Sequence, residues 1–228
     1  MGEITDKIRS RGHWEISIRP LPFEPARIAY GDLMKIIESA VVRMRGWPVP
    51  FIDHRESPIR SETWIGQDVD AESVGHHEAW RFFMSGQFSQ VRAISADWRD
   101  GERLSIPGGY DGVVQVWEVL FYLTEVFELA ARLALGPAGD EQMEIQVCLS
   151  NIENRGLIVG QSNRAEFFEP YRCQVPSLTR EVKISRERLV AEVRAEAVAM
   201  SRDMFLRFGW EPSIEQLSDH QRELSERD

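Results

Sequence analysis

The sequence contains little cysteine and no long hydrophobic run. Its 228 residues include only two cysteines, Cys148 and Cys173, which are too few for a disulfide framework. No apolar stretch approaches the roughly 18 residues that a membrane-spanning helix needs, and the N-terminal residues lack the hydrophobic core of a secretory signal. We therefore expect a soluble protein of a reducing compartment, the cytoplasm.

Positive charge is also scarce. The chain has 27 Lys and Arg residues against 37 Asp and Glu residues, a formal net charge of -10. An acidic protein repels the phosphate backbone of nucleic acids, so nucleic-acid binding is disfavoured. Nucleic-acid binding nevertheless stays a third alternative, because Arg43, Arg45, Arg55 and Arg60 could form a local basic cluster. The hydrophobic fraction of 43% is that of an ordinary globular protein and excludes intrinsic disorder.

Common catalytic motifs are missing from the chain. It has no Gly-x-Ser-x-Gly nucleophile elbow, no Gly-x-x-x-x-Gly-Lys-Ser/Thr phosphate loop and no Gly-x-Gly-x-x-Gly dinucleotide turn. Glu181 and Lys183, with Asp140 as a lone acid, fit the metal site of a nuclease only weakly, because Glu-x-Lys pairs are common in charged chains. These absences favour a protein that is not an enzyme, and we predict no cofactor.

The pattern of apolar residues predicts an α+β fold. No internal repeat or flexible linker divides the chain, so we expect a single domain over residues 1–228. Alternation of apolar and polar residues predicts strands, and short turns between them predict hairpins. The predicted strands are residues 14–19, a hairpin of 79–84 with 87–96, a second hairpin of 143–149 with 157–159, and a short strand at 182–184.

The helical periodicity of apolar residues predicts three long helices and a fourth, polar helix at the C-terminus. They are residues 32–45, residues 112–135, a segment that starts after an N-cap at Ser185 and runs to residue 208, and a polar C-terminal helix or tail at 213–228. We predict an antiparallel or mixed sheet of hairpins packed against the three long helices.

Residues 47–78 are predicted to form a long irregular loop, because three prolines interrupt a polar stretch whose one strand candidate is 63–65. Loops of this length are uncommon unless they serve a function. Imidazole and carboxylate side chains in it, Asp53, His54, His76 and His77, could hold a divalent metal. Their spacing matches no known zinc motif, so a solvated acidic loop is favoured. A metal-dependent hydrolase or nuclease is the alternative.

A second candidate lies on the predicted helix 112–135. Glu118, Tyr122, Glu125 and Arg132 fall roughly on one line of that helix. A desolvated Glu125 facing a cleft would have a raised pKa and could act as a general acid or base, alone or with Glu78. The simpler interpretation is the narrow polar face of a mostly buried helix.

Tryptophan is unusually frequent. Of the seven tryptophans, Trp47, Trp64 and Trp98 lie in or beside predicted loops among polar residues, where an indole can anchor a partner or stack on a flat ligand. Together with Arg45 and Asp53 they are the predicted binding residues.

Three segments resemble an uncharacterised prokaryotic family of conserved hypothetical proteins with no assigned activity. They are Arg-Gly-Trp-Pro-Val-Pro-Phe-Ile-Asp at 45–53, Glu-Ala-Trp-Arg-Phe-Phe-Met-Ser-Gly-Gln-Phe at 78–88 and Glu-Val-Phe-Glu-Leu-Ala-Ala-Arg-Leu at 125–133. The similarity runs from Gly12 to about Glu215. It implies a bacterial or archaeal source and a complete chain, but no activity, cofactor or catalytic residue.

The function predicted from these observations is that of a non-catalytic binding or accessory protein. A face rich in tryptophan, formed by the loop 47–78 and the hairpin 79–96, would bind a protein partner, a second copy in a homodimer, or a small ligand. No membrane association is expected.

Overall fold

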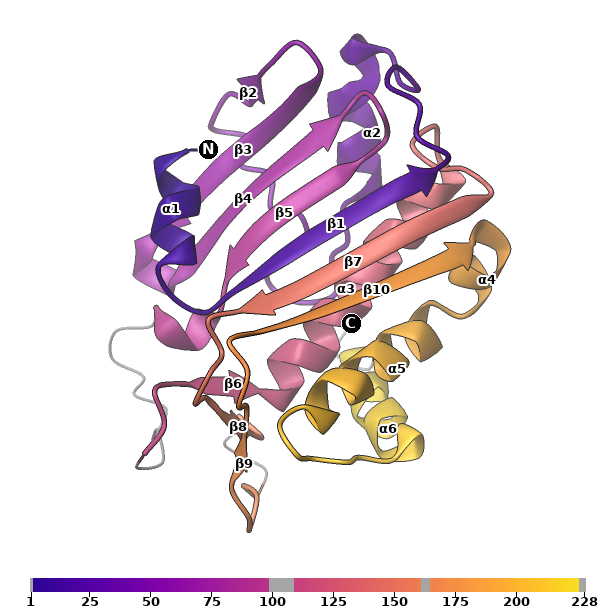
Figure 1. Cartoon of the computed structure of the whole chain (residues 1–228). Helices are drawn as coiled ribbons and strands as arrows, with labels where there is room; N and C mark the ends of the chain where they lie inside the picture. The colour runs from indigo at the N-terminus through magenta and orange to yellow at the C-terminus, as the bar shows by residue number, and fades with distance from the viewer. Residues whose placement is uncertain (1, 99–108, 161–164, 226–228) are drawn as a thin grey trace.

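The computed structural model describes residues 2–98, 109–160 and 165–225. Its centre is an antiparallel sheet of seven strands in the order β10-β7-β1-β5-β4-β3-β2 (Figure 1). The predicted α+β class is therefore confirmed. The strands are β1 (His13–Leu21), β2 (Ile59–Arg60), β3 (Trp64–Ala71), β4 (His76–Phe83), β5 (Phe88–Ala93), β7 (Gln142–Ser150) and β10 (Ser177–Ser185).

Helices cover the two faces of this sheet unequally. The helices are α1 (Glu3–Arg9), α2 (Leu33–Ala40), α3 (Val116–Leu135), α4 (Arg186–Ala191), α5 (Val193–Leu206) and α6 (Ile214–Ser225). Helices α2 to α6 lie on one side of the sheet, whereas α1 lies on the other side over β3, β4 and β5 (Figure 1). No helix in the described ranges is both long and apolar enough to span a lipid bilayer.

A small second sheet adjoins the large one. Its strands are β6 (Val113–Gln115), β8 (Gly156–Ile158) and β9 (Tyr171–Arg172), in the order β6-β8-β9. Short 3-10 turns complete the fold at Tyr30–Asp32, Glu72–Val74 and Ser95–Asp97.

The hydrophobic core lies between the large sheet and α3. Trp14, Ile16 and Ile18 point from β1 toward the helices and are almost fully buried, as their alternation predicts. Helix α3 is apolar on nearly every side because the sheet, α2, α5 and α6 all contact it. A charged side chain on a helix enclosed in this way can be buried only if another residue pairs with it or hydrogen-bonds to it.

The predicted helix 32–45 is too long. Helix α2 ends at Ala40 because Val41 is extended and Val42 pairs with Val49 in a β-bridge. The chain therefore turns away from the helix before Arg45, which is free to reach α3.

The predicted loop 47–78 is largely wrong, because it contains β2, all of β3 and the start of β4. The sequence pattern does not predict these strands because polar side chains occupy positions that face the interior of the protein. Gln67 on β3 is buried, and its amide accepts from the backbone N–H of Asp53 and donates to the Asp53 carbonyl, both at 2.9 Å. Buried polar residues that are hydrogen-bonded in this way break the apolar alternation on which strand prediction depends.

The second predicted hairpin is also wrong. Strand β7 pairs with β1 and β10, whereas β8 pairs with β6 and β9 in the small sheet. The short strand predicted at 182–184 is the end of the nine-residue β10. Strand β1 runs through Pro20, which is tolerated because β5 pairs with β1 only as far as Ile18.

Four other predicted segments are confirmed, differ in a boundary, or lie partly outside the described residues. The cap at Ser185 is confirmed, since its side chain accepts from the Arg188 N–H, but the helix breaks at Glu192 into α4 and α5. Helix α3 begins at Val116, after β6. Helix α6 confirms the polar C-terminal helix as far as Ser225. The glycines and the proline of segment 97–111 predict a connection in the sequence, and its residues 99–108 lie outside the described residues.

Candidate functional site

A cavity of about 280 Å³ lies where β4 begins and β5 ends, beside the first turns of α3. We call it the Trp47 pocket. The charged and aromatic residues of its wall include Arg45, Trp47, His76, Arg92, Trp117 and Glu118.

An ion pair joins the wall of the Trp47 pocket to α3. Arg45 Nε lies 2.9 Å from Glu125 Oε1, and Arg45 Nη2 contacts Glu125 Oε2, so the pairing is bidentate. The Glu125 side chain is completely buried, whereas 27% of the Arg45 side chain is exposed. Burial alone would lower the pKa of Arg45, but the Glu125 carboxylate outweighs it and raises that pKa. Both oxygens of Glu125 thus contact Arg45, which is its structural partner.

A second buried carboxylate is satisfied by the loop and by β4. Glu78 accepts a hydrogen bond from the Phe51 N–H at 2.8 Å, and its other oxygen lies 3.0 Å from His76 Nε2. The His76 ring stacks on Trp47 with 4.6 Å between centroids and 8° between planes. Trp80 donates from Nε1 to the Phe51 carbonyl at 2.9 Å. These contacts fix the loop and hold Trp47 in the wall of the pocket.

A buried tyrosine, Tyr122, supports Arg92 in the wall of the pocket. Tyr122 donates to Gln90 Oε1 at 2.8 Å, and burial raises the pKa of its hydroxyl strongly. The Arg92 guanidinium lies over the Tyr122 ring at 4.7 Å, a cation–π contact. Tyr122 therefore remains neutral and acts as a hydrogen-bond donor and a support for Arg92.

Two charged groups in the wall have incomplete partners. Arg92 Nη1 and Glu118 Oε2 are buried, and neither has a hydrogen-bond partner among the described residues. The other Glu118 oxygen accepts from the Ser95 N–H at 3.2 Å. A buried polar atom without a protein partner can be satisfied by a bound water or by a ligand. Both residues line the Trp47 pocket.

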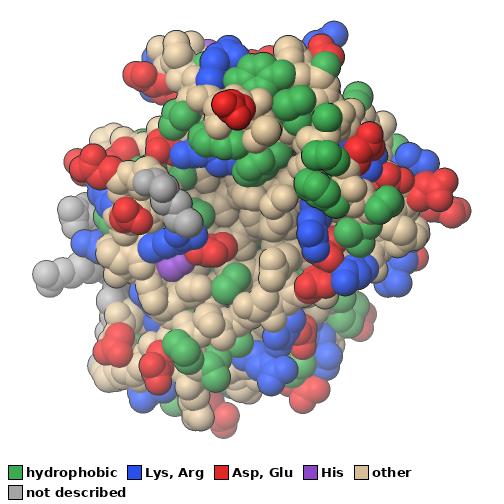
Figure 2. Space-filling view, turned by 45° about the horizontal axis from the view of Figure 1, so that its top comes forward, with side chains coloured by type: hydrophobic (Ala, Val, Ile, Leu, Met, Phe, Trp, Pro, Cys, Tyr) green, Lys and Arg blue, Asp and Glu red, His purple; other side chains and the backbone are tan. Residues whose placement is uncertain are grey.

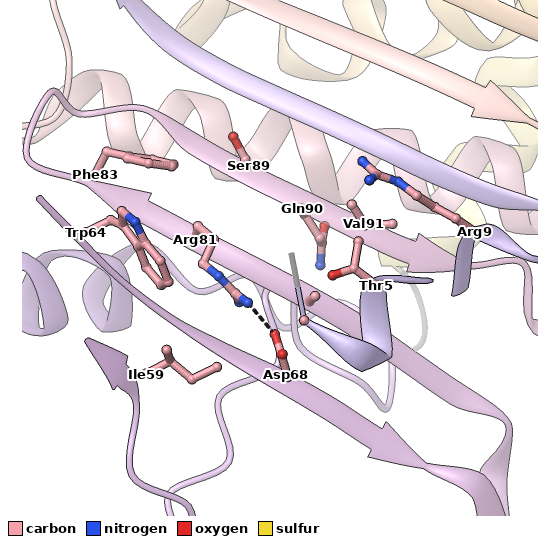
Figure 3. Close-up of a pocket in the computed structure, with 12 residues that line it drawn as sticks. Thr5, Arg9, Ile59, Trp64, Asp68, Arg81, Phe83, Ser89, Gln90 and Val91 are labelled. Carbon is pink, nitrogen blue, oxygen red and sulfur yellow. Dashed lines mark hydrogen bonds and ion pairs between the residues drawn. The ribbon is translucent and has the colours of Figure 1, made fainter. Parts of the chain in front are cut away.

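A wider groove of about 540 Å³ lies on the opposite face of the sheet, between α1 and strands β2 to β5 (Figure 3). Trp64, Phe83 and Ile59 lie at one side of it, and α1 closes the other (Figure 3). Its charged side chains are already paired: Arg81 lies over the Trp64 ring and donates to Asp68 Oδ1 at 2.6 Å (Figure 3), and Arg9 pairs with Glu15. Because each charged side chain among the described residues that line this groove has a partner, the groove is the weaker candidate.

The predicted binding residues do not form one face. Trp47 contacts His76, whereas Trp98 contacts His77 at 4.4 Å. Adjacent residues of a strand point to opposite sides, so Trp47 lies on the side of the large helices and Trp98 on the side of α1. Trp64 shares the face of Trp98, because it contacts Phe83 of β4. The sheet therefore separates Trp47 from the other two indoles.

Asp53 is occupied by a neighbour. Both of its carboxylate oxygens accept from the Arg55 side chain, at 2.9 and 2.7 Å. This guanidinium and the Arg55 backbone N–H lower the pKa of Asp53 to about 2. Asp53 therefore shapes the loop beside the pocket.

The four ligands of the alternative metal site do not converge. His54 is 68% exposed, His76 pairs with Glu78, and His77 faces the other side of the sheet. Within residues 2–98, 109–160 and 165–225, no group of three or more His, Cys, Asp or Glu side chains could hold a metal ion.

Sequence reasoning missed Arg92 as a binding group, and it placed Glu118 on the polar line of the predicted helix 112–135 without connecting it to Arg92. Arg92 lies directly across from Glu78 in the β4–β5 pairing. The hairpin was predicted, but its register was needed to place Arg92 on the inner face. Counting from the Phe82 and Phe88 pair at the turn would have supplied that signal.

His77 is expected to make the fold sensitive to acid. Its Nδ1 lies 2.6 Å from Asp70 Oδ1, and the ring is buried against Trp98. Burial lowers the pKa of His77, although the Asp70 carboxylate opposes this. The unfolded chain protonates the ring near its usual pKa of about 6.5, so unfolding takes up a proton and stability falls as the pH drops below that value.

The measurement is the melting temperature between pH 7.5 and pH 5. In His77→Gln, the loss of melting temperature on acidification should be smaller than in the unmodified protein. His54→Gln, at an exposed position, is the matched control and should keep the original slope. An unchanged slope in His77→Gln would contradict the assignment.

Comparison of the chain with models of protein families, with curated proteins and with solved structures gave no match. The site must therefore be interpreted from its own chemistry. Figure 2 shows basic and acidic side chains interspersed over one face of the molecule, without an extended area of positive charge.

Proposed function

We propose that this chain is a non-catalytic binding protein that holds a small polar ligand in the Trp47 pocket. The observation that carries the proposal is the pair of buried atoms, Arg92 Nη1 and Glu118 Oε2, that lack partners in the described part of the chain and line the same cavity. A bound molecule that accepts from Arg92 and donates to Glu118 would supply both missing hydrogen bonds.

The other polar groups support binding more than catalysis. Glu125 and Glu78, the residues of the acid–base alternative, are each held by two partner atoms. A general acid or base must be within reach of a proton on the substrate, and these carboxylates already serve Arg45, His76 and the Phe51 N–H. Their arrangement stiffens the wall around the pocket, as expected of a preorganised binding site.

The test is a thermal-shift screen with amino acids, nucleobases, simple amines and simple carboxylates as probes. A ligand present at 100 times its Kd stabilises the folded state by about 2.7 kcal/mol, so a binder should raise the melting temperature by several degrees. A protein whose melting temperature responds to no member of the screen would contradict the proposal.

Trp47→Ala should weaken binding of any ligand found in the screen about tenfold or more, because an aromatic wall is lost. Trp64→Ala is the matched control, since Trp64 lies on the other face of the sheet and lines the groove. Affinities are measured by calorimetry and folding by melting temperature. Equal effects of the two substitutions on affinity would place the ligand elsewhere.

A further inference from the structure

The charges of the Trp47 pocket narrow the chemistry of its ligand. Arg45 is neutralised by Glu125, and Glu78 is hydrogen-bonded by His76 and the Phe51 N–H. Arg92 Nη1 and Glu118 Oε2 remain, and neither atom has a hydrogen-bond partner among the described residues. The pocket thus presents one positive and one negative charge that a ligand can complement.

We infer that the ligand is a zwitterion, namely an amino acid with an apolar side chain; this inference rests on the proposed function. Its carboxylate would accept from the Arg92 guanidinium, whose fork of N–H donors suits a carboxylate. Its ammonium would donate to Glu118 Oε2. Each buried charge then receives an opposite charge, which is the condition under which buried charges are tolerated.

Ligands with a single charge fit the pocket less well. A simple carboxylate would complement Arg92 but would leave the buried Glu118 oxygen without a donor and add a second negative charge near it. A simple amine would leave Arg92 Nη1 without an acceptor. An imperfectly paired polar group in a desolvated site costs affinity, so the zwitterion is preferred over either half.

The rest of the wall determines the side chain of the amino acid. Trp47, Trp117 and Phe121 line the cavity, and the rings of Trp117 and Phe121 meet edge to face at 4.9 Å. Aromatic rings favour apolar and flat groups. The cavity volume of about 280 Å³ lies just below the range of roughly 300–1,000 Å³ of pockets for drug-sized molecules, which suits one free amino acid.

The experiment uses L-phenylalanine and its two halves as probes. 3-Phenylpropanoate lacks the ammonium, and 2-phenylethylamine lacks the carboxylate, while both keep the ring. Isothermal calorimetry on the full chain should show binding of L-phenylalanine and at least tenfold weaker binding of each half. Adenine serves as a flat ligand that carries hydrogen-bond donors and acceptors but no charge.

Variants assign each charge to its residue. Glu118→Gln should bind L-phenylalanine and 3-phenylpropanoate with similar affinity, because the partner of the ammonium is gone. Arg92→Gln should bind L-phenylalanine no more tightly than 2-phenylethylamine, and Arg92→Lys, which keeps the charge, should restore part of the difference. Arg207→Gln and Glu215→Gln, at exposed positions, are matched controls, and melting temperatures verify that each variant is folded.

The outcomes separate the two proposals. Tighter binding of L-phenylalanine than of both halves, lost residue by residue as described, supports the zwitterion. Equal binding of L-phenylalanine and 3-phenylpropanoate by the unmodified protein, or binding of adenine alone, overturns the zwitterion but leaves a ligand-binding pocket. Failure of all four probes overturns the zwitterion as well, and the broader thermal-shift screen then decides the proposed function separately.

Discussion

Arg45→Met is expected to lower the free energy of unfolding by about 3–5 kcal/mol, the usual cost of removing one partner of a buried ion pair. Glu125 is completely buried on α3, and its two oxygens are both held by Arg45. Without the guanidinium, the carboxylate must remain charged in an apolar environment or take up a proton. Urea unfolding monitored by tryptophan fluorescence measures the loss.

A double variant makes this prediction specific. Arg45→Met with Glu125→Leu removes both charges and should recover much of the lost stability, because well-packed apolar residues replace buried ion pairs at little cost. Arg55→Met, in the same loop, removes an 85% exposed arginine that also pairs with an aspartate, and should change stability little. A double variant no more stable than Arg45→Met would show that the loss comes from packing and not from the charge on Glu125.

Arg155→Met is expected to cost a similar amount, about 3–5 kcal/mol, and to lower the melting temperature by about 6–20 °C. Arg155 pairs with Asp97 through two contacts of 2.6 and 2.7 Å, with 8% and 11% of the two side chains exposed. Its Nε also donates to the Asn151 carbonyl, and Asp97 accepts from the Gly12 N–H. This one pair therefore joins the start of β1, the segment after β5 and the turn after β7.

Two glycines, Gly12 and Gly112, lie close to the Arg155 guanidinium group. A Cβ at Gly12 or at Gly112 would lie 2.8 or 2.6 Å from atoms of the Arg155 guanidinium group, so both positions must be glycine for Arg155 to fit. Arg222→Met, which removes an exposed ion pair with Asp219 on α6, is the matched control and should change the melting temperature little. Equal melting temperatures of Arg155→Met and Arg222→Met would refute the structural role assigned to Arg155.

Elements with regular apolar periodicity were predictable, and elements with buried polar residues were not. The bounds predicted for strand β1 and helix α3 are close to those observed. The apolar pattern within β1 indicates one buried face, and that within α3 indicates burial on nearly every side. Strand β3 was missed because Gln67 occupies a buried position where an apolar side chain was expected. The end of α2 was misplaced because the bridge between Val42 and Val49 competes with the helix.

The candidate site was predictable only in its parts. Arg45, Trp47, His76 and Glu125 were all singled out, but as members of different hypothetical sites. Arg45 and Glu125 are 80 residues apart in the chain, and no local pattern connects them.

The sequence by itself determined the α+β class, the net negative charge and the approximate positions of the central helix and the first hairpin, because these follow from composition and from periodicity over a few residues. Only the tertiary structure decided which tryptophans share a face, which carboxylates have partners, and that Arg92 and Glu118 meet at one cavity. The physical reason is that strand register and helix packing bring these groups together, and both depend on contacts between residues far apart in the chain.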